Sequence, residues 1–213
     1  MTDAMAGTIT ALRVQKKNKE RVNVYIDEKY AFAVGLNTAL DLRKGQQLTD
    51  AQMAELRAAG EENKAYHQVL RYLGMRPRST SEVRRYLARK EYDAALIDHV
   101  VARVTGEGYL DDQAFAAFWV DNRTRFRPRS ARALRHELRE KGVAPDVIDQ
   151  ALTELDESDA AWDAVAGRLD RWRDLDEREF AQKLIGFLSR RGFSYAVARA
   201  TCDRAWEQLQ SDA

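Results

Sequence analysis

The 213-residue chain has little cysteine, proline and histidine, and it has no long run of apolar residues. Its single cysteine, Cys202, excludes a disulfide within the chain. No apolar run approaches the roughly 20 residues that a membrane-spanning helix needs. The start of the chain, Met1–Ala4, lacks the basic-then-apolar pattern of a secretory signal peptide. We therefore expect a cytoplasmic protein with no membrane partner.

Groups that carry out catalysis are also scarce. No glycine-rich phosphate loop ends in Lys-Ser or Lys-Thr, and no Cys/His spacing predicts a zinc site. The three histidines, His67, His99 and His136, are scattered. The adjacent Asp111 and Asp112 precede an apolar helical segment, which favours capping by one of them over metal binding. We expect no enzymatic activity, no metal and no cofactor.

What the chain does contain is an internal repeat. Leu87, Leu138 and Leu188 align at intervals of 51 and 50 residues. The flanking positions that keep this register are Val83, Leu134 and Leu184, then Lys90, Lys141 and Arg191, then Tyr92, Val143 and Phe193. A period of this size predicts stacked supersecondary units, because one unit cannot bury its apolar face alone. Such elongated arrays present an extended surface to a large partner.

Each repeat is predicted to contain three helices. Ser79 and Glu82 form an N-terminal capping signature for the middle helix of the first repeat. Gly142 and Gly192 stand where the middle helices of the other two repeats need a left-handed closing residue. The first repeat has Glu91 at that position, so we expect its helix to end differently. Cys202 aligns with apolar residues, which predicts a buried thiol.

The N-terminal part has a different pattern. Three short segments rich in β-branched and aromatic residues predict an antiparallel meander, with strands at residues 8–14, 22–26 and 30–34. Three strands need cover on one face. The Leu36–Leu42 segment and a helix after Thr49 are the candidates, and Thr49 with Gln52 predicts a capping box for that helix.

The predicted fold is therefore mainly α, a tandem array of three three-helix repeats preceded by a small antiparallel β segment. The predicted parts are a β-meander segment at 1–48, a connecting helix at 49–64, and three-helix repeats at 65–112, 113–158 and 159–213.

The net charge of +1 conceals a segregation of charge along the chain. Residues 64–141 carry a net charge of +7, whereas residues 142–213 carry −6. Acidic residues are few within the basic stretches, so ion pairs inside one helix cannot neutralise most of the arginines. Such a chain can contact a nucleic acid with one part and a protein with another, although solvated helix faces are the simpler interpretation.

The arginines are the candidate binding residues. Arg132, Arg135 and Arg139 are spaced i, i+3 and i+7, which places them on one face of a helix. Phe126 is the candidate for an exposed aromatic beside them, one that can stack on a base or on a side chain of a partner. The full set of candidate contacts to a protein filament or to DNA is Arg76, Arg78, Arg84, Arg85, Arg123, Arg125, Arg127, Arg132, Arg135 and Arg139.

Several motifs of the chain occur in combination. They are Gly108, Tyr109, Leu110, Asp111 and Asp112 followed by Phe115, then Leu138 with Lys141–Val143, and the pairs Ile97–Asp98 and Ile148–Asp149. Together, over residues 8–209, they resemble the RecX family of bacterial recombinase regulators. The resemblance implies tandem three-helix units that bind the RecA recombinase filament on DNA and suppress its strand exchange and ATPase activities. It implies no catalytic residues, and it gives the Gly108–Phe115 signature a structural role.

Two functions follow as hypotheses. The first is a regulator, mainly an inhibitor, of RecA in DNA repair and homologous recombination, which binds the RecA–DNA filament and its single-stranded DNA as a monomer. The basic repeats would contact DNA phosphates or an acidic filament surface, and the acidic third repeat would contact protein. Capping of filament ends and coating of the filament groove both stay open. The second hypothesis is an independent protein that binds naked DNA through the basic face of repeats 1 and 2.

Overall fold

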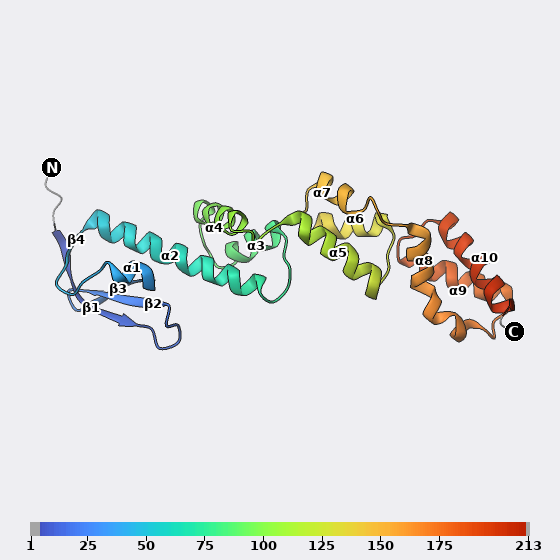
Figure 1. Cartoon of the computed structure of the whole chain (residues 1–213), viewed down its shortest axis with the longest axis horizontal. Coiled ribbons are helices and arrows are strands. Elements are labelled where there is room, and N and C mark those ends of the chain that lie inside the picture. The colour runs from blue at the N-terminus through green and yellow to red at the C-terminus, as the bar shows by residue number, and fades with distance from the viewer. Residues whose placement is uncertain (1–4, 212–213) are drawn as a thin grey trace. The chain divides into compact units, whose positions relative to one another are not determined.

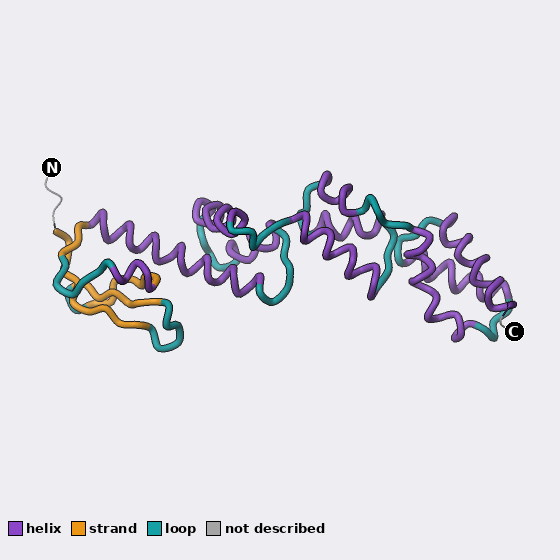
Figure 2. Tube along the Cα trace, in the orientation of Figure 1, coloured by secondary structure: helices purple, strands orange, loops and turns teal. Residues whose placement is uncertain are grey.

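The structure is a computed structural model, and it describes residues 5–211 (Figure 1). The chain divides into two compact units. The first unit comprises residues 1–76 and 83–109, and the second comprises residues 77–82 and 110–213. The predicted fold class is confirmed, because helices dominate and a small antiparallel sheet precedes them (Figure 2). None of the helices described has both the length and the hydropathy that crossing a bilayer requires.

The sheet of the first unit has four antiparallel strands in the order β3-β2-β1-β4. The strands are β1 (Met5–Val14), β2 (Arg21–Ile26), β3 (Lys29–Gly35) and β4 (Gln47–Thr49). Val22, Val24 and Ile26 are buried as their alternation predicts. The three-strand meander is confirmed, but β4 was not predicted. A strand of three residues is too short for alternation to show, and only its pairing with β1 defines it.

A long helix covers the sheet. Helix α1 (Leu36–Leu40) is short and buries none of its residues, whereas α2 (Asp50–Leu73) packs on β3. The predicted capping box of α2 is present, since Thr49 and Gln52 exchange side-chain and backbone hydrogen bonds. A Cβ atom on Gly60 would lie 2.1 Å from the Ala33 carbonyl oxygen. Glycine at this position therefore lets the helix backbone approach the strand closely.

The first unit also contains α4 (Ala94–Gly106) and most of α3 (Thr80–Ala88), of which the residues from Val83 onward belong to this unit. Val83 and Leu87, two positions of the sequence repeat, are fully buried there. Val69 of α2 and Val100 of α4 are also fully buried, and α2 contacts α4. The register of the repeat thus identified two buried positions of α3 correctly.

The expectation that the first repeat closes its middle helix differently is wrong. Glu91 has a φ of 63°, in the same left-handed region as Gly142 at 76° and Gly192 at 93°. The Tyr92 N–H then donates to the Leu87 carbonyl, the bond that closes the helix in all three repeats. This closure satisfies carbonyls left free at the helix end, so the turn forms even with a residue that adopts the conformation at a cost.

The second unit contains two further groups of three α-helices, the second of which also has a 3₁₀ helix. The helices are α5 (Asp112–Phe126), α6 (Ala131–Glu140) and α7 (Pro145–Ala151), then α8 (Glu157–Val165), the 3₁₀ helix η1 (Ala166–Trp172), α9 (Glu177–Arg190) and α10 (Tyr195–Ser211). Leu134 and Leu138 of α6 are fully buried against Phe115 and Ile148. Each group thus has a core of its own, centred on the leucines of the repeat.

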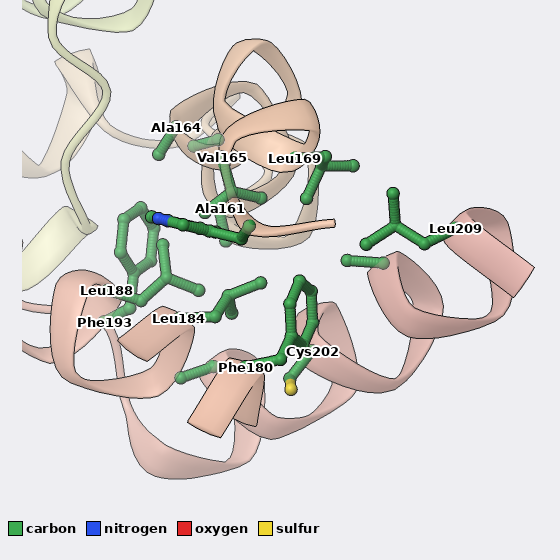
Figure 3. Packing of buried hydrophobic residues seen from close by; sticks show 14 residues of the cluster. Ala161, Ala164, Val165, Leu169, Phe180, Leu184, Leu188, Phe193, Cys202 and Leu209 are labelled. Carbon is green, nitrogen blue, oxygen red and sulfur yellow. The ribbon is translucent and has the colours of Figure 1, made fainter. Parts of the chain in front are cut away.

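The core of the last group is shown in Figure 3. Leu184 and Leu188 of α9 are fully buried there, together with Phe180. Cys202 of α10 points into the same core and is 3% exposed. Burial raises the pKa of its thiol, which disfavours the reactive thiolate. The prediction of a buried thiol at this position of the repeat is confirmed.

Within the second unit, residues 77–82 contact the loop that closes α6. The predicted Ser79–Glu82 capping pair is present, with the Glu82 N–H donating to Ser79 Oγ at 3.1 Å. Ser79 Oγ donates in turn to the Lys141 carbonyl at 2.6 Å. A Cβ on Gly142 would lie 2.4 Å from Ser81, so this loop packs directly on the start of α3. The residues of the second unit that begin α3 are thereby held against the loop that closes α6.

The next junction has the same design. The Ser130 side chain caps α6 by accepting from the Ala133 N–H at 3.2 Å. The Ser130 N–H donates to the Arg191 carbonyl, and a Cβ on Gly192 would lie 2.7 Å from Ser130 Oγ. The equivalence of the two junctions explains why both the serine and the glycine recur with the period of the repeat.

Candidate functional site

Five residues of the Gly108–Phe115 segment have structural roles. Gly108 closes α4 with a φ of 78°, and Leu110 and Phe115 are buried. Asp111 caps α5 by accepting from two backbone N–H groups, which confirms the capping interpretation. Asp112 accepts from the Thr80 N–H at 2.8 Å. The two carboxylates therefore bind helix N-termini, and no group of three metal-ligating side chains occurs among residues 5–211.

Several candidate arginines pair with carboxylates on a neighbouring helix. In the first unit, Arg84 of α3 contacts Asp98 of α4 at 2.5 Å. In the second, Arg135 of α6 contacts Asp149 of α7 at 2.8 Å. These two pairs occupy equivalent positions of the repeat. Both aspartates belong to the Ile-Asp motifs found in the sequence, which gives those motifs a physical role.

A second set of pairs surrounds the end of α5. Glu137 accepts from both Arg123 at 2.7 Å and Arg129 at 3.0 Å, and all three side chains are largely buried. Arg125 contacts Asp121 one turn earlier on its own helix at 2.8 Å. The charge of Arg123 is thus neutralised by Glu137, so this arginine is not a free cation at the surface. The exposed Arg125 pair contributes well under 1 kcal/mol in water and competes weakly with an incoming phosphate.

The remaining candidates differ in how free their charge is. Arg127 and Arg139 are exposed, and neither side chain makes a hydrogen bond or an ion pair with another residue that the structure describes. Arg132 is exposed and donates to the Gly192 carbonyl at 3.1 Å, which keeps its charge uncompensated. The predicted stripe on α6 therefore contains two uncompensated cations and one, Arg135, that is paired.

The candidates near the start of α3 are divided between the units. Arg76 belongs to the first unit and is half-buried, and Arg85 is exposed on α3. Arg78 belongs to the second unit and is half-buried. All three make contacts with other residues, so their charges are not freely available.

One group of cations was missed from the sequence. Arg168 and Arg171 on η1 lie with Arg191 around a cavity that also contains Arg125 and Phe126 from the end of α5. The spacing of Arg168 and Arg171 by three residues places them on one face of a helix. The net negative charge of the surrounding sequence directed attention away from them. Phe126 is 79% exposed, as expected for an aromatic outside the core.

Family models match four successive parts of the chain. They describe the regulatory protein RecX N-terminal domain at residues 7–49, and the first, second and third three-helix domains of RecX at residues 65–103, 111–152 and 156–202. Regulatory protein RecX of Bacillus subtilis (strain 168) is 35% identical over 201 residues, which are 92% of this chain and 76% of that protein. The protein of the same name from Listeria monocytogenes serotype 4a (strain HCC23) is 29% identical over 206 residues, covering 94% and 77%.

Solved structures of RecX proteins are also similar to this chain. A crystal structure of regulatory protein RecX superposes with a TM-score of 0.70 at 29% identity, over 92% of this chain and 99% of that one. The crystal structure of RecX from Lactobacillus salivarius gives a TM-score of 0.59 at 18% identity, over 70% and 97%, and supports the fold alone.

Proposed function

The chain belongs to the RecX family of regulatory proteins, and from this premise we propose that it regulates the RecA recombinase, mainly as an inhibitor. The protein binds the RecA–DNA filament as a monomer and lowers filament stability, ATPase activity and strand exchange. It acts in the cytoplasm, without catalysis of its own, in DNA repair and homologous recombination. The observation that carries the proposal is the match of all four RecX domains along the chain.

The uncompensated arginines supply a physical basis for contact with the DNA of the filament. Arg132 and Arg139 on α6 and Arg127 before it are exposed cations of the second unit. Guanidinium groups match the geometry of phosphate oxygens. Once one repeat is bound, the other repeats are held near the filament at a high effective concentration. Several weak contacts together therefore bind the filament more tightly than any single contact does.

The deciding experiment compares the filament with bare DNA. The purified protein is titrated onto the host recombinase assembled with ATP on single-stranded DNA, and separately onto the same DNA alone, across a series of salt concentrations. We expect tight binding to the filament, weak binding to DNA alone, and a fall in recombinase ATPase activity. Affinity should decrease as salt rises, because phosphate contacts release counterions.

Equal binding to both would contradict the proposal. It would favour the second candidate function, an independent DNA-binding protein that uses the basic face of repeats 1 and 2, which the uncompensated Arg127, Arg132 and Arg139 of repeat 2 support. Tight filament binding without any change in ATPase activity or strand exchange would also contradict a regulatory role.

A further inference from the structure

The second unit contains a cavity of about 350 Å³ between the end of α5 and the segment formed by α8 and η1. The residues that line it are Arg125, Phe126, Pro128, Asp163, Ala164, Gly167, Arg168, Arg171 and Arg191. Four of these nine are arginines, and Asp163 is the single carboxylate. We call this cavity the arginine pocket.

Two arginines of the pocket share one aromatic ring. The guanidinium carbon of Arg191 lies 4.5 Å from the centre of the Phe187 ring, and that of Arg168 lies 4.8 Å from it. Arg191 also donates to the Pro128 carbonyl at 2.8 Å. These contacts hold both guanidinium groups in place without neutralising them. Phe187 thus keeps two cations close together in a fixed arrangement.

Neighbouring charges leave the pocket positive. Burial lowers the pKa of Arg191, and the nearby cations Arg168, Arg127 and Arg129 lower it further. Arg171 is exposed and makes no ion pair with any residue the structure describes. Positive groups held close together repel one another, so a bound anion would relieve a real electrostatic cost.

The chemistry of the pocket favours phosphate joined to a base. Guanidinium groups donate pairs of hydrogen bonds to phosphate oxygens. Phe126, beside them, is 79% exposed and offers an aromatic face on which a base can stack. A duplex has its base faces already stacked, whereas a single strand can present one to the ring. An acidic peptide would use the arginines but not the ring.

We infer that the arginine pocket binds the phosphodiester backbone of a single-stranded nucleic acid, with one base stacked on Phe126. The inference rests on the proposed contact of this protein with DNA and gives that contact a place. It also assigns a nucleic-acid site to the third repeat, although residues 142–213 carry a net charge of −6. The positive charge is local, because η1 brings Arg168 and Arg171 toward the end of α5.

Charge reversal tests the phosphate contact. The affinity of Arg168→Glu with Arg171→Glu for a fluorescent oligothymidine is measured by anisotropy across a salt series, with the protein alone. We expect binding at least about tenfold weaker and a salt slope reduced by about 1 to 1.5, the effect of losing two phosphate contacts to a single strand. The matched control is Arg178→Glu with Lys183→Glu, which makes the same charge change on exposed residues of α9 outside the pocket.

A second variant tests the stacking. Phe126→Ala removes an exposed ring, so the fold stays intact, and circular dichroism checks this. We expect about fivefold or greater loss of affinity for oligothymidine, the lower end of the effect of a lost base stack. Affinity for an abasic oligonucleotide of the same length should be unchanged, because it has no base to stack.

The outcomes separate this inference from the proposed function. If the pocket variant binds oligothymidine as well as its α9 control, the inference is wrong, whatever the filament assay shows. Binding of a labelled polyglutamate that depends on the pocket, with no binding of the oligonucleotide, would also overturn it and assign the pocket to acidic protein. Oligonucleotide binding that depends on the pocket, without any binding to the RecA filament, would instead overturn the proposed function alone.

Discussion

At Glu91 a charged side chain occupies a backbone conformation for which the other two repeats use glycine. Its φ of 63° belongs to the left-handed region, where a Cβ atom crowds the following carbonyl oxygen at a cost of roughly 1–2 kcal/mol. Glycine escapes this cost but loses more conformational freedom on folding. The balance between the two determines what a substitution at this residue does.

Glu91→Gly should stabilise the first unit by about 0.5–1 kcal/mol, because the relief of backbone strain exceeds the entropy that glycine adds to the unfolded chain. Urea denaturation followed by circular dichroism measures the change. Glu91→Ala is the control, since it removes the same carboxylate and retains the strain. Equal stability of the two variants would show that the lost charge, and not the backbone, is responsible.

Glu107 belongs to a polar cluster on the first unit. Its carboxylate accepts from the Tyr66 hydroxyl and, at 3.0 Å, from Arg103 Nε. These two hydrogen bonds, with that of Tyr66 the larger influence, lower the pKa of Glu107. The Arg103 guanidinium also lies 3.9 Å from the centre of the Tyr66 ring. The cluster therefore favours the ionised form of Glu107 in the folded protein.

Stability should depend on pH through this group. The lowered pKa means that Glu107 contributes stability above its unfolded pKa, and that this contribution is lost as pH falls through the folded pKa. Glu107→Gln should lower the melting temperature at neutral pH and flatten its decline in acid. Glu55→Gln, which changes an exposed carboxylate of α2 with no ion pair in the described chain, is the control. Parallel acid limbs for the unchanged protein and Glu107→Gln would contradict the assignment.

At the scale of elements, the contact of α2 with β3 depends on a missing side chain. A Cβ on Gly60 would lie 2.1 Å from the Ala33 carbonyl oxygen and 3.1 Å from its carbonyl carbon. These are backbone atoms of a paired strand, so they cannot move aside as a flexible side chain would. The packing of the helix on the sheet is therefore tighter here than any residue other than glycine permits.

Gly60→Ala should destabilise the protein by about 1–3 kcal/mol, the usual cost of overpacking, in spite of the better helix propensity of alanine. Thermal unfolding measures the loss. The control is Gly106→Ala in α4, where a Cβ meets nothing within 4 Å and should be neutral or slightly stabilising. If both variants behave alike, the close approach of α2 to β3 is wrong.

The capped start of α3 is a second element whose stability can be measured. Ser79 is fully buried, accepts from the Glu82 N–H and donates to the Lys141 carbonyl. Ser79→Ala should therefore cost about 1–2 kcal/mol, because it removes the cap and leaves the half-buried Lys141 carbonyl without this donor. Ser158→Ala, an exposed position in the first turn of α8, is the control and should change stability little. An equally small effect at Ser79 would contradict a structural junction at this serine.

At the scale of the whole molecule, the distribution of charge matters more than its sum. The net charge is +1, yet residues 64–141 carry +7. Ion pairs such as Arg84–Asp98 and Arg135–Asp149 neutralise part of the arginine charge within the repeats. The cations that stay uncompensated are those available to a polyanion, and they include two of the three arginines of the stripe on α6.

Changing Arg132, Arg135 and Arg139 together to Glu should weaken filament binding and make it less sensitive to salt, since fewer phosphates are neutralised. Filament binding across a salt series measures both effects. The control changes Lys16, Lys17 and Lys19 to Glu, three exposed residues between β1 and β2 with the same total charge change. Equal losses in both variants would mean that overall charge, and not the α6 face, governs binding.

The sequence by itself determined the repeat and its buried positions. Leu87, Leu138 and Leu188 are all fully buried, as their common register predicts. Helical periodicity and capping patterns are local, so they can be recognised without knowing which parts of the chain meet. The same holds for the capping roles of Ser79 and Asp111, which depend on backbone groups only two or three residues away.

Only the tertiary structure decided which cations are free and where they gather. Asp149 pairs with Arg135 from a different helix, so no count of charges within one helix reveals the pair. Arg168 joins Arg191 and Arg125 only because η1 and the end of α5 line the same cavity. The separation of these residues along the chain carries no periodic signal. Their juxtaposition is a consequence of packing, and it creates the arginine pocket within a part of the chain whose net charge is negative.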